Sequence, residues 1–159
     1  MHVRIIAVGK IKEKYLREGI AEYEKRLQPY VKLQILELTG VKRSALASLS
    51  GERQARDKEG EQILAAIPPG SFTIALDGKG TDWSSGKLAE SFRQWELAGR
   101  NQITFIIGGD LGLAPEVLSK SDLRLSLSNM TFTHPIARLL LLEQVYRVYR
   151  INSGEPYHK

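Results

Sequence analysis

The chain has 159 residues, the length of one ordinary domain, and 42% of them are hydrophobic, which is enough for a single sizeable core. Its 23 Lys and Arg residues outnumber its 18 Asp and Glu residues, and the resulting net charge of +5 favours an anionic partner. Cysteine is absent and no apolar run approaches the roughly 20 residues of a membrane span, which excludes disulfide scaffolds, thiolate nucleophiles, Cys-ligated zinc sites and membrane-spanning helices.

The first half of the chain alternates strand and helix patterns. A β-branched run begins directly after Met1 with no signal-peptide pattern, so we expect a cytoplasmic protein that does not associate with membranes. Gly9 and Pro29 end the first strand and the first helix. The predicted elements are a strand at 3–8, a helix at 16–28, a strand at 33–38, a basic loop at 40–51 and a charged helix at 52–67.

The second half repeats this alternation with stronger strand patterns. Asp77-Gly78 is a common turn pair and is expected to stop the first of these strands. Ser84 or Ser85 can cap a helix, and Pro115 suits the first turn of another. This order predicts one α/β domain over all 159 residues, with a mostly parallel sheet. The predicted elements are strands at 72–76, 103–107 and 123–127, helices at 85–98 and 135–150, and a short helix from 115.

The excess positive charge lies towards the two ends of the chain. Residues 1–60 carry a net charge of +5, residues 61–131 carry −2 and residues 132–159 carry +2. The cations near the start either solvate a helix face or contact the phosphates of a nucleic acid without reading its sequence. These cations are Lys10, Lys12, Lys14 and Arg17.

Two predicted strands end in glycine-rich segments. Asp77 and Gly78 follow one strand, and Gly108 and Gly109 follow another. Glycine lets backbone N–H groups approach a ligand closely, and ligands of open α/β sheets lie at the carboxyl ends of strands. The spacing matches neither a dinucleotide fingerprint nor a P-loop, and each segment alone could be a simple turn. Together the two segments can form one wall of a pocket.

A third segment, residues 125–135, mixes hydroxyl and amide side chains with Met and Phe directly before the last predicted helix. Such a loop can offer backbone hydrogen bonds to the edge of an adenine while its apolar side chains enclose the ring. The alternative is an ordinary helix entry that is capped by Thr133 or His134.

The last predicted helix is apolar on most of its faces, which suggests a core on one side and a subunit interface on the other. Glu143 and Arg147 are four residues apart and are expected to pair. The tail either frays or docks beside a reacting base, with Tyr157 for stacking and His158 for proton transfer. The three histidines are scattered and form no ligand pattern, so no metal is expected.

Four blocks of the sequence together resemble the RlmH (YbeA) family of SPOUT-class methyltransferases, and the resemblance extends over the whole chain. The blocks are Phe105–Leu113, Leu127–His134, Arg138–Arg147 and Pro156–Lys159. The resemblance implies a compact α/β domain in which the segment at about 103–150 forms a deep trefoil knot, although true knots are rare in proteins. It also implies a homodimer that packs through the knot region.

The resemblance further implies S-adenosylmethionine as the cofactor and a set of site residues. The positions that match the family's cofactor contacts are Leu76, Gly108, Gly109, Leu127, Ser128, Asn129, Met130, Thr131 and Phe132. The positions that match the catalytic region are Glu143, Arg147, Tyr157 and His158, of which the last two would reach the active site of the partner subunit.

The implied activity is methylation of N3 of a pseudouridine in the helix-69 loop of 23S rRNA, within the assembled 70S ribosome. N3 must lose a proton, and we favour His158 as its acceptor because imidazole titrates near neutrality. Arg147 could stabilise the imide anion, and Tyr157 could orient the base. Two alternatives are a non-enzymatic ribosome-binding factor and an α/β domain that binds a nucleotide phosphate at Gly108-Gly109.

Overall fold

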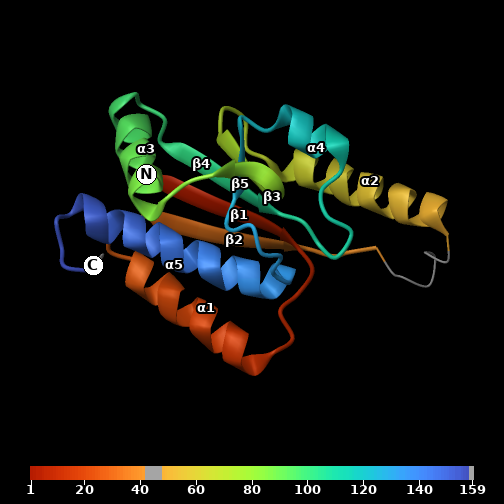
Figure 1. The fold of residues 1–159 in the computed structure, drawn as a ribbon, viewed down its shortest axis with the longest axis horizontal. Helices are drawn as coiled ribbons and strands as arrows, with labels where there is room; N and C mark the ends of the chain where they lie inside the picture. Colours follow the sequence, from red (N-terminus) through yellow and green to blue (C-terminus); the bar gives the residue numbers. More distant parts are fainter. Residues whose placement is uncertain (42–47, 158–159) are drawn as a thin grey trace.

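The computed structural model describes residues 1–41 and 48–157, and within them strands and helices alternate from the first strand to the last helix (Figure 1). The predicted α/β class and order of elements are confirmed. The strands are β1 (His2–Val8), β2 (Lys32–Leu38), β3 (Phe72–Asp82), β4 (Gln102–Ile107) and β5 (Leu123–Ser126). The helices are α1 (Lys14–Leu27), α2 (Leu49–Ala66), α3 (Ser85–Leu97), α4 (Pro115–Lys120) and α5 (His134–Asn152).

These five strands pair in parallel, in the order β2-β1-β4-β3-β5. β1 lies between β2 and β4, and all its residues from Val3 to Val8 are buried except Arg4. Such continuous apolar runs are typical of parallel strands that are covered on both faces. Because parallel strands point the same way, the loops that follow them meet at one edge of the sheet, which we call the carboxyl edge.

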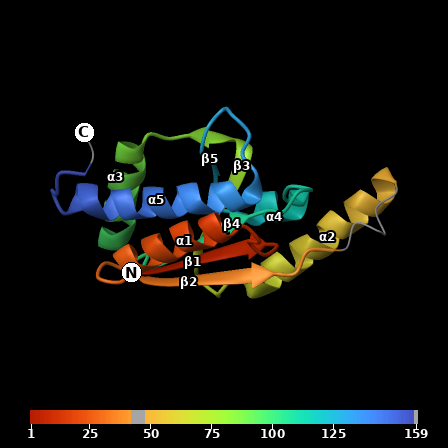
Figure 2. The ribbon, with the colours of Figure 1, turned by 90° about the horizontal axis from the view of Figure 1, so that it is seen from below.

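Helices cover both faces of the sheet. Successive side chains of a strand point to opposite faces, so Val3 and Ile5 of β1 join the core beneath α1, α3 and α5, whereas Ile6 and Val8 join the core beneath α2 and α4. α5 contacts both α1 and α3. Figures 1 and 2 show α1 and α5 running side by side along the sheet, and α2 extending beyond the end of β2.

β3 is longer than its sequence predicts. Asp77-Gly78 does not stop the strand, because pairing with β5 resumes after a shift of register that begins at Leu76. Irregularities of this kind, like β-bulges, can re-aim side chains beside functional sites. Gly80 permits the register shift, since a Cβ there would lie 2.7 Å from the backbone of Arg124. The prediction that Asp77-Gly78 stops the strand is therefore wrong, because the tertiary pairing with β5 overrides the local signal.

α2 begins earlier than predicted. The loop predicted over 40–51 gives way to helix at Leu49, because the Ser48 hydroxyl caps the helix by accepting a hydrogen bond from Gly51 N at 3.2 Å. Residues 42–47 of that predicted loop lie outside the described residues.

The start of α5 is fixed by a buried arginine. Arg138 is 2% exposed, its Nη2 donates to the Gly9 carbonyl at 3.1 Å, and its Nη1 lies 2.6 Å from Glu37 Oε2. A buried guanidinium is costly without such partners, so α5 is held beside the ends of β1 and β2. Since β5 lies at the opposite side of the sheet, the chain between β5 and α5 crosses the carboxyl edge.

Candidate active site

Three segments at the carboxyl edge line a single cavity of about 750 Å³. The first is the register shift within β3, and the other two are the loops that follow β4 and β5. These strands are neighbours in the sheet, and α2, α4 and the start of α5 supply the remaining wall. Both the position and the volume are typical of small-molecule sites in α/β proteins. All the residues predicted to hold a cofactor line this cavity, namely Leu76, Gly108, Gly109, Leu127, Ser128, Asn129, Met130, Thr131 and Phe132. Their role in binding stays a prediction.

The loop after β4 is a tight glycine turn. Gly112 N donates to Gly109 O at 3.0 Å, and Gly112 has a φ of +74°, a left-handed conformation that favours glycine. A Cβ on Gly108 would lie 2.9 Å from the carbonyl carbon of Gly112, which leaves no room for a side chain. This turn therefore presents backbone to the cavity.

The loop after β5 carries apolar side chains that remain exposed in the described chain. Met130 is 76% exposed and Phe132 is 38% exposed, and both line the cavity. Two serine hydroxyls shape the loop: Ser126 Oγ donates to Ser128 O at 2.9 Å, and Ser128 Oγ accepts from Met130 N at 3.0 Å. Apolar side chains on a loop with a shaped backbone suit a planar heteroaromatic ring.

An ion pair closes the side of the cavity next to β3 and β5. Two nitrogens of Arg124 donate to Asp77 Oδ2, at 2.5 and 3.1 Å. Burial raises the pKa of the Asp77 carboxyl, but hydrogen bonds from Arg124 and from Lys79 N outweigh burial and bring the pKa below its ordinary value. Asp77 is therefore ionised at neutral pH. The sequence motifs do not point to Arg124, because its contact with Asp77 depends on β3 and β5 being neighbours.

His134 lines the cavity from the first turn of α5. Its Nε2 lies 3.8 Å from Asp110 Oδ1, and its Nδ1 is buried without a hydrogen bond in the part of the chain that the structure describes. Burial lowers the pKa of the imidazole despite the opposing charge of Asp110, so His134 is neutral at neutral pH. The predicted capping role is not observed: Thr133 is the N-cap residue, and its side chain makes no capping hydrogen bond.

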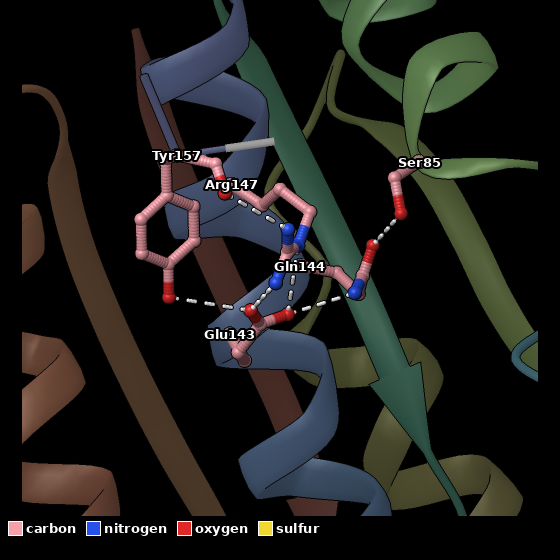
Figure 3. A network of polar contacts seen from close by, with 5 residues as sticks. All are labelled: Ser85, Glu143, Gln144, Arg147 and Tyr157. Atoms are coloured by element: carbon pink, nitrogen blue, oxygen red, sulfur yellow. Dashed lines mark hydrogen bonds and ion pairs between the residues drawn. The ribbon is translucent and has the colours of Figure 1, made fainter. Parts of the chain in front are cut away.

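A second polar feature, which we call the Glu143 cluster, comprises Ser85, Glu143, Gln144, Arg147 and Tyr157 (Figure 3). Arg147 donates to both carboxylate oxygens of Glu143, which confirms the predicted pair. Tyr157 OH donates to Glu143 Oε1 at 3.3 Å, and Gln144 Nε2 donates to Glu143 Oε2 at 2.7 Å. Ser85 Oγ donates to Gln144 Oε1 at 2.6 Å, which extends the network to α3.

The tail docks on α5 as far as Tyr157. Glu155 forms an ion pair with Arg150, and the guanidinium carbon of Arg147 lies 4.7 Å from the centre of the Tyr157 ring. Burial raises the pKa of Tyr157 to about 12, so its phenol is protonated at neutral pH and acts as a donor. His158, the predicted proton acceptor, lies outside the described residues.

The cavity and the Glu143 cluster are separate within one chain. Ala137 lines the cavity, and at 1.5 Å per residue Glu143 and Arg147 lie about 9 and 15 Å further along α5. Among the described residues, the lining of the cavity includes no member of the cluster. A smaller cavity of about 270 Å³, lined in part by the loop after β5 and by Gln144, lies beside both features. Within one chain, Glu143, Arg147 and Tyr157 therefore do not line the larger cavity.

Within residues 1–41 and 48–157, no group of three or more His, Asp and Glu side chains is arranged to hold a metal ion. Over the same residues, no helix is both long enough and apolar enough to cross a membrane.

Known proteins resemble this chain over its full length. The family described as "Predicted SPOUT methyltransferase" matches residues 1–158. A protein of Methanoregula boonei named "Putative ribosomal RNA large subunit methyltransferase H" is 58% identical over 100% of both chains. The proteins named ribosomal RNA large subunit methyltransferase H in Carboxydothermus hydrogenoformans and Clostridioides difficile are 50% and 52% identical, also over 100% of each chain.

A solved structure shares the fold at much lower identity. It is described as "a probable methylase family protein from Haemophilus influenzae Rd KW20", with 15% identity and a TM-score of 0.56 over 99% of this chain and 70% of that chain. At this identity the likeness concerns the fold alone. The family match and the full-length relatives decide the assignment. The chain belongs to the SPOUT methyltransferase family and, within it, to the RlmH group that its four sequence blocks resemble.

Proposed function

We propose that this protein transfers a methyl group from S-adenosylmethionine to large-subunit ribosomal RNA, the activity for which its full-length relatives are named. The finer target that we propose is N3 of a pseudouridine in the helix-69 loop of 23S rRNA, within the assembled ribosome. The observation that carries the proposal is the convergence of three segments, distant in the sequence, on one cavity of about 750 Å³.

The cavity suits S-adenosylmethionine in size and chemistry. When bound, the cofactor supplies a methyl group on a sulfonium that is already a strong electrophile. Leu127, Met130 and Phe132 would enclose the adenine, and Leu76 would bound the cavity where the register of β3 shifts. The glycine turn at 108–112 has no side chain to keep a ligand away from its backbone.

The residues of the Glu143 cluster and the tail would remove the N3 proton and stabilise the imide that remains. His158 is the candidate acceptor, since imidazole titrates near neutrality. Arg147 is the candidate cation for the imide, and Glu143 fixes its guanidinium by accepting hydrogen bonds from two of its nitrogens. Tyr157 is protonated at neutral pH, so it would orient or stack on the target base and would not accept the proton.

A homodimer, in which the Glu143 cluster of one subunit completes the cavity of the other, is part of this proposal. Within one chain the cluster lies about 9 to 15 Å beyond the cavity along α5. Large apolar side chains remain exposed on the loop after β5 and in the first turn of α5, with Met130 at 76% and Ile136 at 37%. Exposed apolar side chains are typical of an interface, and a two-fold axis would let each tail reach the cavity of the partner.

The deep knot over about 103–150 is also proposed, as the RlmH fold implies. In support, α5 starts beside β1 and packs on the face opposite to α4, although β5 lies at the far side of the sheet. Mechanical extension from both termini tests the knot. A tightened trefoil would keep the extended length below roughly 3.3–3.6 Å per residue, whereas full extension would contradict it.

The deciding experiment is a radiolabelled methyl-transfer assay on ribosomes that lack the modification, followed by mapping of the labelled nucleoside. We expect label at one pseudouridine of 23S rRNA, and far less label on protein-free rRNA fragments. The alternative, a non-enzymatic ribosome-binding factor, predicts no heat of binding when the protein is titrated with S-adenosylmethionine.

The same assay tests the proton acceptor. His158→Ala should lower turnover about 100-fold or more, which is the usual size of general-base catalysis. Turnover within about twofold of wild type would remove His158 as an essential base.

A further inference from the structure

We propose that Arg56 binds the carboxylate of the methionyl part of S-adenosylmethionine, an inference that rests on the proposed function. Arg56 lies on α2 and lines the cavity. The next turn of α2 lies close to the loop after β4, since a Cβ on Gly109 would lie 3.9 Å from Glu59 Oε2. Arg56 is therefore the contribution of α2 to the wall of the cavity near the glycine turn.

Arg56 has no partner within residues 1–41 and 48–157. Its Nε is buried and makes no hydrogen bond, and no ion pair joins its guanidinium to an acidic side chain of that part of the chain. A buried donor without an acceptor is costly and rare in folded proteins. Because this donor belongs to a residue that lines a cavity, we infer that a ligand supplies the missing acceptor.

The other basic side chains that line the cavity are paired with an acid, uncharged or exposed to solvent. Arg124 is held by two hydrogen bonds to Asp77. His134 is neutral, because burial lowers the pKa of its imidazole. Lys79 is exposed, so its ammonium is solvated without a ligand. Among these residues, Arg56 is thus the cation that needs a hydrogen-bond acceptor, and a bound anion would supply one.

The anion that reaches Arg56 has to enter the cavity with its ligand. Phosphates of an RNA backbone would meet exposed cations, whereas the Nε of Arg56 is withdrawn from solvent. The target base carries no negative charge until N3 loses its proton. The carboxylate of the cofactor is charged throughout, and a guanidinium binds a carboxylate in a planar, two-point geometry.

Calorimetric titration with two ligands tests the assignment: S-adenosylmethionine and its decarboxylated analogue, which lacks only the carboxylate. For Arg56→Ala we expect the Kd of S-adenosylmethionine to rise about 10-fold, the size of a hydrogen bond to a charged group. The Kd of the decarboxylated analogue should change less than about twofold, so the preference for the carboxylate is lost. Arg53→Ala is the matched control, since Arg53 is exposed one turn earlier on α2.

Four other outcomes would each overturn the inference. An equal weakening of both ligands by Arg56→Ala would indicate a structural role. If Lys79→Ala, and not Arg56→Ala, removed the preference for S-adenosylmethionine over its decarboxylated analogue, the carboxylate would be assigned to Lys79. Unchanged cofactor affinity with weaker ribosome binding would assign Arg56 to an RNA phosphate. Failure of the wild-type protein to bind S-adenosylmethionine would instead overturn the proposed function, and the inference with it.

Discussion

The cavity at the carboxyl edge is lined in part by glycine backbone and exposed apolar side chains, whereas the Glu143 cluster is an ion pair on α5 that neutral polar side chains support. The cavity leaves polar atoms such as Arg56 Nε and His134 Nδ1 without a hydrogen bond. In the cluster, by contrast, both oxygens of Glu143 have donors. The cavity is therefore incomplete until a ligand fills it, while the cluster holds its own geometry. This contrast suggests that binding and proton chemistry belong to separate parts of the chain.

We expect the strongest effect from Glu143→Gln. The amide loses the charge that orients Arg147, so turnover should fall about 100-fold or more. The Kd for S-adenosylmethionine should stay within about twofold, because Glu143 does not line the cavity. Glu22→Gln is the control, since Glu22 pairs with Arg26 at 3.0 Å on the exposed side of α1. A parallel loss of cofactor affinity would show that the two features are coupled.

Mixing two defective chains tests whether the features meet across subunits. Gly108→Val should damage the cavity and Glu143→Gln the cluster, and each variant alone should be nearly inactive. Co-expressed in equal amounts, they should recover about a quarter of wild-type turnover, because half of the dimers are mixed and each mixed dimer has one intact composite site. If both features act within one chain, the mixture will stay inactive.

A smaller effect is expected from alanine at two glycines of the cavity wall. Gly108→Ala should raise the Kd for S-adenosylmethionine about 10-fold, because its Cβ would meet the Gly112 backbone at 2.9 Å and force the turn to shift. Gly78→Ala should change the Kd less than about twofold, since a Cβ there meets no atom within 4 Å. Calorimetric titration of both variants compares them. Equal effects would mean that the tight turn after β4 has no special part in binding.

The weakest effect concerns pH and His134. Burial lowers the pKa of this imidazole from its ordinary 6.5, so the folded state favours the neutral form. Its contribution to folding stability is complete above pH 6.5 and is lost as the pH falls through the lowered pKa of the folded state. Urea unfolding above and below pH 6.5 should therefore show that the free energy of unfolding depends less on pH for His134→Gln than for wild type. The same dependence of the free energy on pH for both proteins would contradict this account.

Much of the fold could be predicted because its signals are local. The β-branched run at 103–107 and the glycines that follow it indicate β4, and Pro115 marks the start of α4. The errors occur where distant contacts override local preference. Asp77-Gly78 reads as a turn, yet pairing with β5 carries β3 past it.

The candidate site could be predicted only in part. Eight of the nine cofactor positions lie in the sequence blocks, the ninth is Leu76 at the end of the predicted strand 72–76, and all nine line the cavity. Arg56 and Arg124 carry no signal in the sequence, because a charged residue in a predicted helix or strand usually faces solvent. Their significance comes from contacts between elements that are far apart in the chain.

Residue patterns along the chain were sufficient for the type and order of the elements, for the Glu143–Arg147 pair and for the family, since each depends on periodicity, short spacing or shared motifs. The order of strands in the sheet, the meeting of three segments in one cavity and the position of the Glu143 cluster outside its lining became visible only in the folded chain. The reason is that parallel strands become neighbours through crossovers of many residues, and no local pattern encodes which strands will pair.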